Sequence, residues 1–128
     1  GIQFEARVFI PSVLPFQSGH LAIIFGNLLE NALEACRKLP QEQRYIMLEA
    51  TYIKEMLQIC IKNGSPEKLK KDNSGRYLTT KEDNGWHGIG LASVEQALAD
   101  YDGELFTQYE NGEFQASAVL YSNSIEEK

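Results

Sequence analysis

The sequence has few basic side chains and no long apolar runs, and each of these features disfavours a class of function. Its 128 residues carry 12 Lys and Arg against 18 Asp and Glu, a formal net charge of −6. A protein that binds duplex nucleic acid normally presents a basic face, so nucleic acid is disfavoured as a partner. The apolar runs are far shorter than a membrane span, and no signal-peptide pattern opens the chain.

Cysteine is also scarce. Cys36 and Cys60 have no ligand-spaced Cys or His beside them, which disfavours a zinc site. Cys36 falls on the apolar face of a helix pattern and Cys60 within an apolar strand pattern, so we expect two buried thiols in a reducing compartment. The length fits one globular domain. Because a strand-like run begins directly after Gly1, we expect that domain to be part of a larger protein.

The first half of the chain predicts a strand, a helix and two further strands. Apolar residues alternate over 2–10, the period of a half-buried strand. From Leu21 to Cys36 they recur at helical spacing, with Ser12 or Ser18 available as the N-cap and His20 just before the helix. The next two runs, 45–53 and 57–61, are rich in β-branched and aromatic residues, and Lys54-Glu55 between them predicts a tight hairpin.

The second half predicts a long loop, a helix and a closing hairpin. The segment 64–86 has no periodicity, which is typical of a functional loop. Helical spacing returns over 89–101, with Gly103 as its C-cap. Strands over 105–109 and 114–121 are joined by Asn111-Gly112, a strong hairpin signal. Together the elements predict an α+β two-layer sandwich, with a mixed, mostly antiparallel sheet packed on one layer of helices.

The first predicted helix carries two carboxamides, Asn27 and Asn31, one turn apart on a polar stripe that also holds Glu34 and Lys38. Asparagine is a poor helix former, so the pair calls for an explanation. Residues four apart lie one above the other and can reach the same small ligand, and carboxamides suit a hydrated Mg²⁺ ion. The alternative, a stripe that simply faces water, remains open at this point.

Gly88 and Gly90 flank Ile89 where the second predicted helix begins. Glycine there is costly unless the backbone must approach something closely, and the N–H groups of a helix start attract anions. The two motifs together indicate a nucleotide site.

These motifs resemble those of a known superfamily. The stretch 27–35, Asn-Leu-Leu-Glu-Asn-Ala-Leu-Glu-Ala, resembles the N-box of the GHKL ATPases, and Gly88-Ile89-Gly90-Leu91 resembles their second glycine box. The stretches 59–63, 78–81 and 87–91 are most similar to catalytic domains of sensor histidine kinases, in the branch of the peptide quorum-sensing receptors of Gram-positive bacteria. The resemblance covers nearly the whole chain and implies a Bergerat-type ATP-binding sandwich over residues 1–128, with an ATP lid at about 64–86.

The resemblance also implies roles for individual residues. Asn31 matches the catalytic residue that ligates Mg²⁺ and bridges it to the phosphates of ATP. Asn27 stands where hydrolytic members carry Glu, and because an amide is no general base, this favours phosphoryl transfer over hydrolysis. Asn63 replaces the Asp that recognises adenine, and its side-chain oxygen can still accept a hydrogen bond from the exocyclic amine. An Asp at position 63 would be the stronger acceptor. The first glycine box is eroded to Gly64-Ser65-Pro66.

The other residues assigned to ATP binding lie near these motifs: Lys38, Lys81, His87, Gly88, Ile89, Gly90 and Leu91. The implied function is transfer of the γ-phosphate of Mg·ATP to a histidine on an upstream dimerisation domain, with a downstream response regulator. The whole protein is then expected to be a membrane-bound homodimer with this domain in the cytoplasm. Two alternatives stay open: a degenerate GHKL domain that mediates protein interaction, and a serine kinase acting on a regulatory protein.

Overall fold

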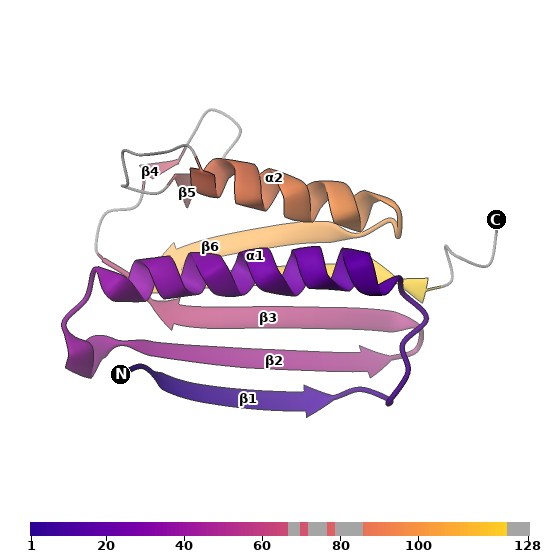
Figure 1. Cartoon of the computed structure of the whole chain (residues 1–128), viewed down its shortest axis with the longest axis horizontal. Coiled ribbons are helices and arrows are strands. Elements are labelled where there is room, and N and C mark those ends of the chain that lie inside the picture. Colours follow the sequence, from indigo (N-terminus) through magenta and orange to yellow (C-terminus); the bar gives the residue numbers. More distant parts are fainter. Residues whose placement is uncertain (67–69, 72–76, 79–85, 123–128) are drawn as a thin grey trace.

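The computed structural model describes residues 1–66, 70–71, 77–78 and 86–122, which form a five-stranded sheet with two helices on one face (Figure 1). In chain order the elements are β1 (Gln3–Phe9), α1 (Ser18–Arg37), a 3₁₀ turn (Gln41–Gln43), β2 (Tyr45–Ile53), β3 (Met56–Gly64), β4 (Lys70–Lys71), β5 (Tyr77–Leu78), α2 (Trp86–Ala99), β6 (Glu104–Glu110) and β7 (Glu113–Tyr121).

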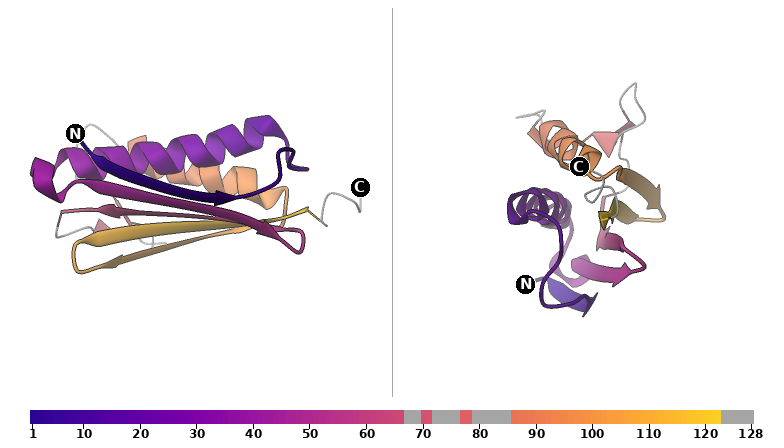
Figure 2. Two further views of the ribbon diagram at one scale, coloured as in Figure 1. Left: turned by 90° about the horizontal axis from the view of Figure 1, so that it is seen from below. Right: turned by 90° about the vertical axis from the view of Figure 1, so that its right-hand side faces the viewer.

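The sheet order is β1-β2-β3-β7-β6, and only the β1–β2 pair among these neighbours is parallel. Seen along the sheet, both helices lie on the same side, and the opposite face carries no described layer (Figure 2). This confirms the predicted α+β sandwich with a mixed, mostly antiparallel sheet.

Both predicted hairpins are present, and their turn residues explain why. Lys54 and Glu55 have φ of 54° and 64°, and Asn111 and Gly112 have φ of 52° and 80°. Two successive residues with positive φ are typical of the type I′ turn, whose twist matches that of the strands it joins.

The core lies between the helices and the centre of the sheet. α1 packs against β3 and α2, and the core residues follow the helical and alternating periods of the sequence. The most deeply buried large aliphatic side chains from the helices and strands are Ile24, Leu28, Leu57, Ile59, Ile61, Val94, Leu98 and Leu120.

The first strand is not half-buried as its alternation predicts. Phe4 and Val8 pair in register with buried residues of β2 and so point to the helix-facing side, yet they are 55% and 49% exposed. β1 is an edge strand, and α1 lies over β3 rather than over β1. Alternation predicted the strand correctly, but the burial of one face depends on where the helix lies.

The helix boundaries also differ from the prediction. α1 begins at Ser18 after the N-cap Gln17, which makes no side-chain capping hydrogen bond, so neither Ser12 nor Ser18 is the cap. His20 therefore lies in the first turn of α1 instead of before it. α2 begins at Trp86, and the residue with positive φ beyond its end is Asp102, at 53°, not Gly103. Cys36 is buried as expected, but Cys60 is only partly buried.

Within the predicted loop 64–86, Gly64 still belongs to β3, and the two short strands β4 and β5 pair antiparallel. The segments 67–69, 72–76 and 79–85 of that loop, which include Lys81, lie outside the described residues. None of the described helices has the length and apolar character needed to cross a membrane.

Candidate functional site

The polar stripe of α1 faces α2. His20, Asn27 and Asn31 lie at positions i, i+7 and i+11, which places them on one side of the helix. The Nδ1 atom of His20 is 2.5 Å from the hydroxyl oxygen of Tyr101, just after the end of α2. Since α1 also packs along α2, the side that carries both carboxamides faces the second helix and not open water.

The two carboxamides are half-buried, and the one at Asn27 is held by its own helix. Its Nδ2 donates a hydrogen bond of 2.8 Å to the carbonyl oxygen of Ile23, which leaves the side-chain oxygen as the group that points away from the backbone. On the same stripe, Glu34 is only 7% exposed and forms a 2.8 Å ion pair with Arg37. Lys38 is exposed at the C-cap of α1.

Asn63 is fixed near the end of β3. It is 1% exposed, its register partners are Ile46 and Phe114, and its Nδ2 donates a 2.8 Å hydrogen bond to the carbonyl oxygen of Gly64. That contact leaves the side-chain oxygen of Asn63 as an acceptor beside the helix layer.

Close packing leaves no room for a side chain at Gly64. A Cβ there would lie 2.8 Å from the carbonyl oxygen of Gln43 and 3.2 Å from Cε1 of Tyr45. The chain between α1 and β2 thus presses on the end of β3 beside Asn63.

The second glycine motif lies inside the first turns of α2, which is helical from Trp86 onward. The N-cap and the first three helical residues have N–H groups without a partner in the helix, and the fourth helical residue makes the first intrahelical bond. Because α2 begins at Trp86, Gly88 still offers a backbone donor, whereas the N–H groups of Ile89 and Gly90 are used by the helix. Leu91, also predicted as a site residue, is 2% exposed and belongs to the core. Its side chain therefore packs beneath the glycine motif. The side chain of His87 lies outside the described residues.

These three pieces meet at one end of the molecule. α1 and α2 run antiparallel, so the C-terminal half of α1, the end of β3 and the beginning of α2 all lie at the left of Figure 1. The strand pair β4–β5 lies at the same end. The fold thus places the elements that carry Asn31, Asn63 and Gly88, which are far apart in the sequence, at the same end of the molecule.

One buried polar group at this end was not singled out as a site residue from the sequence. Ser65 is 3% exposed, and its Oγ has no hydrogen-bond partner among the described residues. The available signal was the eroded glycine box, where Ser65 brings a hydroxyl into a segment normally built from glycine. Among the same residues, no three His, Cys, Asp or Glu side chains form a metal-binding cluster.

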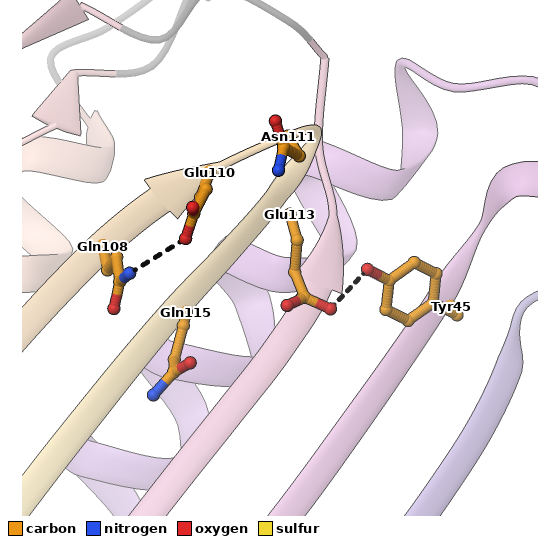
Figure 3. A pocket seen from close by; sticks show the side chains of 6 residues that line it. All are labelled: Tyr45, Gln108, Glu110, Asn111, Glu113 and Gln115. Atoms are coloured by element: carbon orange, nitrogen blue, oxygen red, sulfur yellow. Dashed lines mark hydrogen bonds between the residues drawn. The ribbon is translucent and has the colours of Figure 1, made fainter.

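A separate pocket of about 400 Å³ lies on the uncovered face of the sheet, at the β6–β7 hairpin (Figure 3). Its lining residues are Tyr45, Gln108, Glu110, Asn111, Glu113 and Gln115. None of these is a predicted site residue, and the alternation of β2, β6 and β7 points their side chains away from the helices.

The fold is that of histidine kinase catalytic domains. Over 96% of this chain and 82% of that chain, it resembles the catalytic domain of histidine kinase ThkA with a TM-score of 0.71 and 16% identity. The mycobacterial sensor histidine kinase MprB matches with a TM-score of 0.67 and 20% identity, over 94% of this chain and 81% of that chain. The Erythrobacter litoralis EL346 blue-light activated histidine kinase matches with a TM-score of 0.72 and 12% identity, over 99% of this chain and 37% of that one.

Sequence identities this low show a shared fold only. The family is shown instead by a match of the sequence to a family model. The family model of the GHKL domain matches residues 17–120, so the chain belongs to the GHKL domain family. No curated protein sequence matches it. The resemblance to GHKL domains read from the N-box and the second glycine box is thereby confirmed, while the Gram-positive quorum-sensing branch stays a prediction.

Proposed function

We propose that this chain is the ATP-binding catalytic domain of a two-component sensor histidine kinase. It transfers the γ-phosphate of Mg·ATP to a histidine on a dimerisation domain that is not part of this chain. The observation that carries the proposal is the meeting of the α2-facing carboxamides of α1, the side-chain oxygen of Asn63 and the amide-rich start of α2, within a GHKL domain.

The donor set suits Mg·ATP. Asn31 supplies a neutral oxygen, the hard ligand that Mg²⁺ takes while it keeps waters and phosphate oxygens as its other ligands. Asn63 presents an acceptor to the exocyclic amine of adenine, and the free backbone N–H groups of the first turn of α2, up to that of Gly88, meet the phosphates. Bound Mg²⁺ would neutralise charge that develops on the phosphates, and phosphoryl transfer asks little more of the protein than positioning and such charge stabilisation.

The neutral side chain of Asn27 supports transfer rather than hydrolysis. A carboxylate at this position could deprotonate an attacking water, and an amide whose nitrogen is bonded to the carbonyl of Ile23 cannot. Lys38, Lys81 and His87 complete the proposed ATP-binding residues as groups that approach the phosphates.

The same proposal extends to the protein that would contain this domain. It includes an ATP lid at about 64–86, a dimeric partner domain and a response regulator that receives the phosphoryl group. It also includes a membrane-anchored receptor of the Gram-positive peptide-sensing branch, with this domain on the cytoplasmic side. These parts rest on the resemblance of the motifs.

The test is a calorimetric titration of the domain with ATP in the presence and absence of Mg²⁺. We expect binding that depends on Mg²⁺ and that Asn31→Ala weakens by about 2 kcal/mol or more, because the metal loses its protein ligand. Glu30→Ala, one residue away on α1 and on a different side of the helix, serves as the matched control and should bind ATP as the wild type does.

Phosphoryl transfer is tested on the full-length protein with γ-labelled ATP, where label should appear as acid-labile, base-stable phosphohistidine. A domain that binds no nucleotide under either condition would instead support the degenerate GHKL alternative. Label that is stable to acid would favour a serine kinase.

A further inference from the structure

Ser65 carries a buried hydroxyl that has no hydrogen-bond partner in the described part of the chain, and this is unusual for a folded protein. Its side chain is 3% exposed, and no described residue hydrogen-bonds to its Oγ. A buried polar group that bonds neither to protein nor to water costs stability, so such groups are rare and call for an explanation. One explanation is that a bound ligand supplies the hydrogen-bond partner of Oγ, and the residues around Ser65 indicate which ligand group that is.

The backbone places this hydroxyl on the same side of the sheet as Asn63. Gly64 pairs with Glu113 in the β3–β7 ladder, and the N–H of Ser65 continues that ladder with a 2.9 Å hydrogen bond to the carbonyl oxygen of Gly112. Side chains alternate along an extended strand, so Ser65 returns to the helix-facing side two residues after Asn63.

The chain around Ser65 is held firmly. Beyond it, the carbonyl oxygen of Pro66 accepts a 2.8 Å hydrogen bond from the hydroxyl of Tyr109. Before it, close packing of Gly64 against Gln43 fixes the end of β3. The hydroxyl is therefore presented at a defined position, on the same side of the sheet as the side chain of Asn63 and two residues further along the strand.

From this placement we infer that Ser65 is a base-reading residue of the site, whose hydroxyl donates a hydrogen bond to ring nitrogen N1 of adenine. The inference rests on the proposed function, in which Asn63 accepts from the exocyclic amine. The amine and N1 are neighbours on the same edge of adenine, one a donor and the other an acceptor. An amide oxygen next to a hydroxyl donor complements that pair.

The experiment is a calorimetric comparison of ATP with an analogue in which N1 is replaced by C–H, both with Mg²⁺. We expect the wild type to bind the analogue about 10-fold more weakly, the loss typical of one buried hydrogen bond. Ser65→Ala should bind ATP about 10-fold more weakly than the wild type and should no longer distinguish the two nucleotides. Ser117→Ala, on the uncovered face of the sheet, is the matched control and should behave as the wild type.

Thermal unfolding without nucleotide tests independently whether Oγ of Ser65 has a hydrogen-bond partner within the protein. Removing an unpaired buried hydroxyl should leave the melting temperature of Ser65→Ala equal to or above that of the wild type. A clear decrease would show that Oγ has a partner within the protein and would overturn the inference.

The two proposals fail in different ways. If the wild type binds ATP but Ser65→Ala discriminates against the analogue as strongly as the wild type does, only the role of Ser65 is wrong. If the wild type binds neither nucleotide, the proposed function falls and the role of Ser65 falls with it.

Discussion

At the scale of single residues, the chemistry of Asn63 depends on which end of its amide is already engaged. The nitrogen donates to the carbonyl oxygen of Gly64 at 2.8 Å, and the side chain is 1% exposed. From the sequence alone, Asp at this position should improve adenine binding, since a charged acceptor makes the stronger hydrogen bond. The local contact reverses that expectation, because a carboxylate would set a second acceptor against the carbonyl oxygen.

We therefore expect Asn63→Asp to destabilise the free domain by about 1–3 kcal/mol at neutral pH and to bind Mg·ATP no more tightly than the wild type. Burial raises the pKa of such a carboxyl, so the folded variant takes up a proton at a higher pH than the unfolded chain does. Its stability relative to the wild type should consequently recover as the pH falls. Thermal unfolding from pH 7 to pH 4 measures this, and a gap that stays constant would contradict the proposed contact.

The pair formed by Tyr45 and Glu113 on the uncovered face gives a second prediction at this scale (Figure 3). The hydroxyl of Tyr45 donates to the Glu113 carboxylate at 2.6 Å. Burial, and then the hydrogen bond and the charge of Glu113, raise the pKa of Tyr45 above its ordinary value of 10.0.

Tyr45→Phe should lower the free energy of unfolding by about 1 kcal/mol at pH 7. This is less than a fully buried hydrogen bond to a charged group contributes, because the pair is only partly buried. Above pH 10 the unfolded wild type ionises before the folded one, which lowers wild-type stability. The difference between wild type and variant should then shrink as the pH rises from 9 to 11. In chemical denaturation, Glu113→Gln should show a smaller loss at pH 7, since it keeps an acceptor without the charge.

At the scale of elements, the turn that ends α2 depends on two neighbouring residues, Asp102 and Gly103, for two different reasons. The N–H of Asp102 bonds to the carbonyl oxygen of Ala99, and the N–H of Gly103 bonds to that of Leu98 at 3.0 Å. This is the Schellman pattern, in which the residue with left-handed φ precedes the last donor. Here Asp102 has that φ, and Gly103 is glycine for another reason: a Cβ would lie 2.2 Å from the carbonyl oxygen of Val119.

Opposite effects should follow from two neighbouring substitutions. Gly103→Ala should destabilise the domain by about 3 kcal/mol, because strand β7 would have to move away from the new methyl group. Asp102→Gly should stabilise it by about 0.5–1 kcal/mol, because glycine adopts a positive φ without steric cost. Chemical denaturation of both variants is the measurement. A destabilised Asp102→Gly would indicate that the aspartate side chain contributes to the turn.

The predictability of each element followed the range of the forces that define it. The hairpins at Lys54 and Asn111 were predictable because the turn is decided by two adjacent residues. The start of α1 was not, because the N-cap Gln17 makes no side-chain capping hydrogen bond. Its backbone N–H instead donates a 3.2 Å hydrogen bond to the hydroxyl oxygen of Tyr101, which is distant in the sequence. The exposure of β1 likewise depends on where α1 lies on the sheet.

At the scale of the whole molecule, the candidate site exists only because three elements meet. The stripe on α1 and the glycines of α2 could be recognised in the sequence as motifs, and their order predicted a shared nucleotide site. Ser65 needed the structure, because its burial follows from the β3–β7 register and from the packing of Gly64. A ligand bound between α1, β3 and α2 should accordingly stabilise the domain as a unit.

Gly88→Val tests this coupling between ligand and fold. In the first turn of a helix, valine costs no more than glycine, so the free variant should melt within a few degrees of the wild type. Saturation with Mg·ATP at about 100 times its dissociation constant should add about 2.7 kcal/mol to the wild type and raise its melting temperature by roughly 10 °C. In the variant the rise should be largely lost, since the β-branched side chain hinders close approach of the phosphates to the N–H groups of α2. A full rise in Gly88→Val would show that the phosphates do not approach the start of α2.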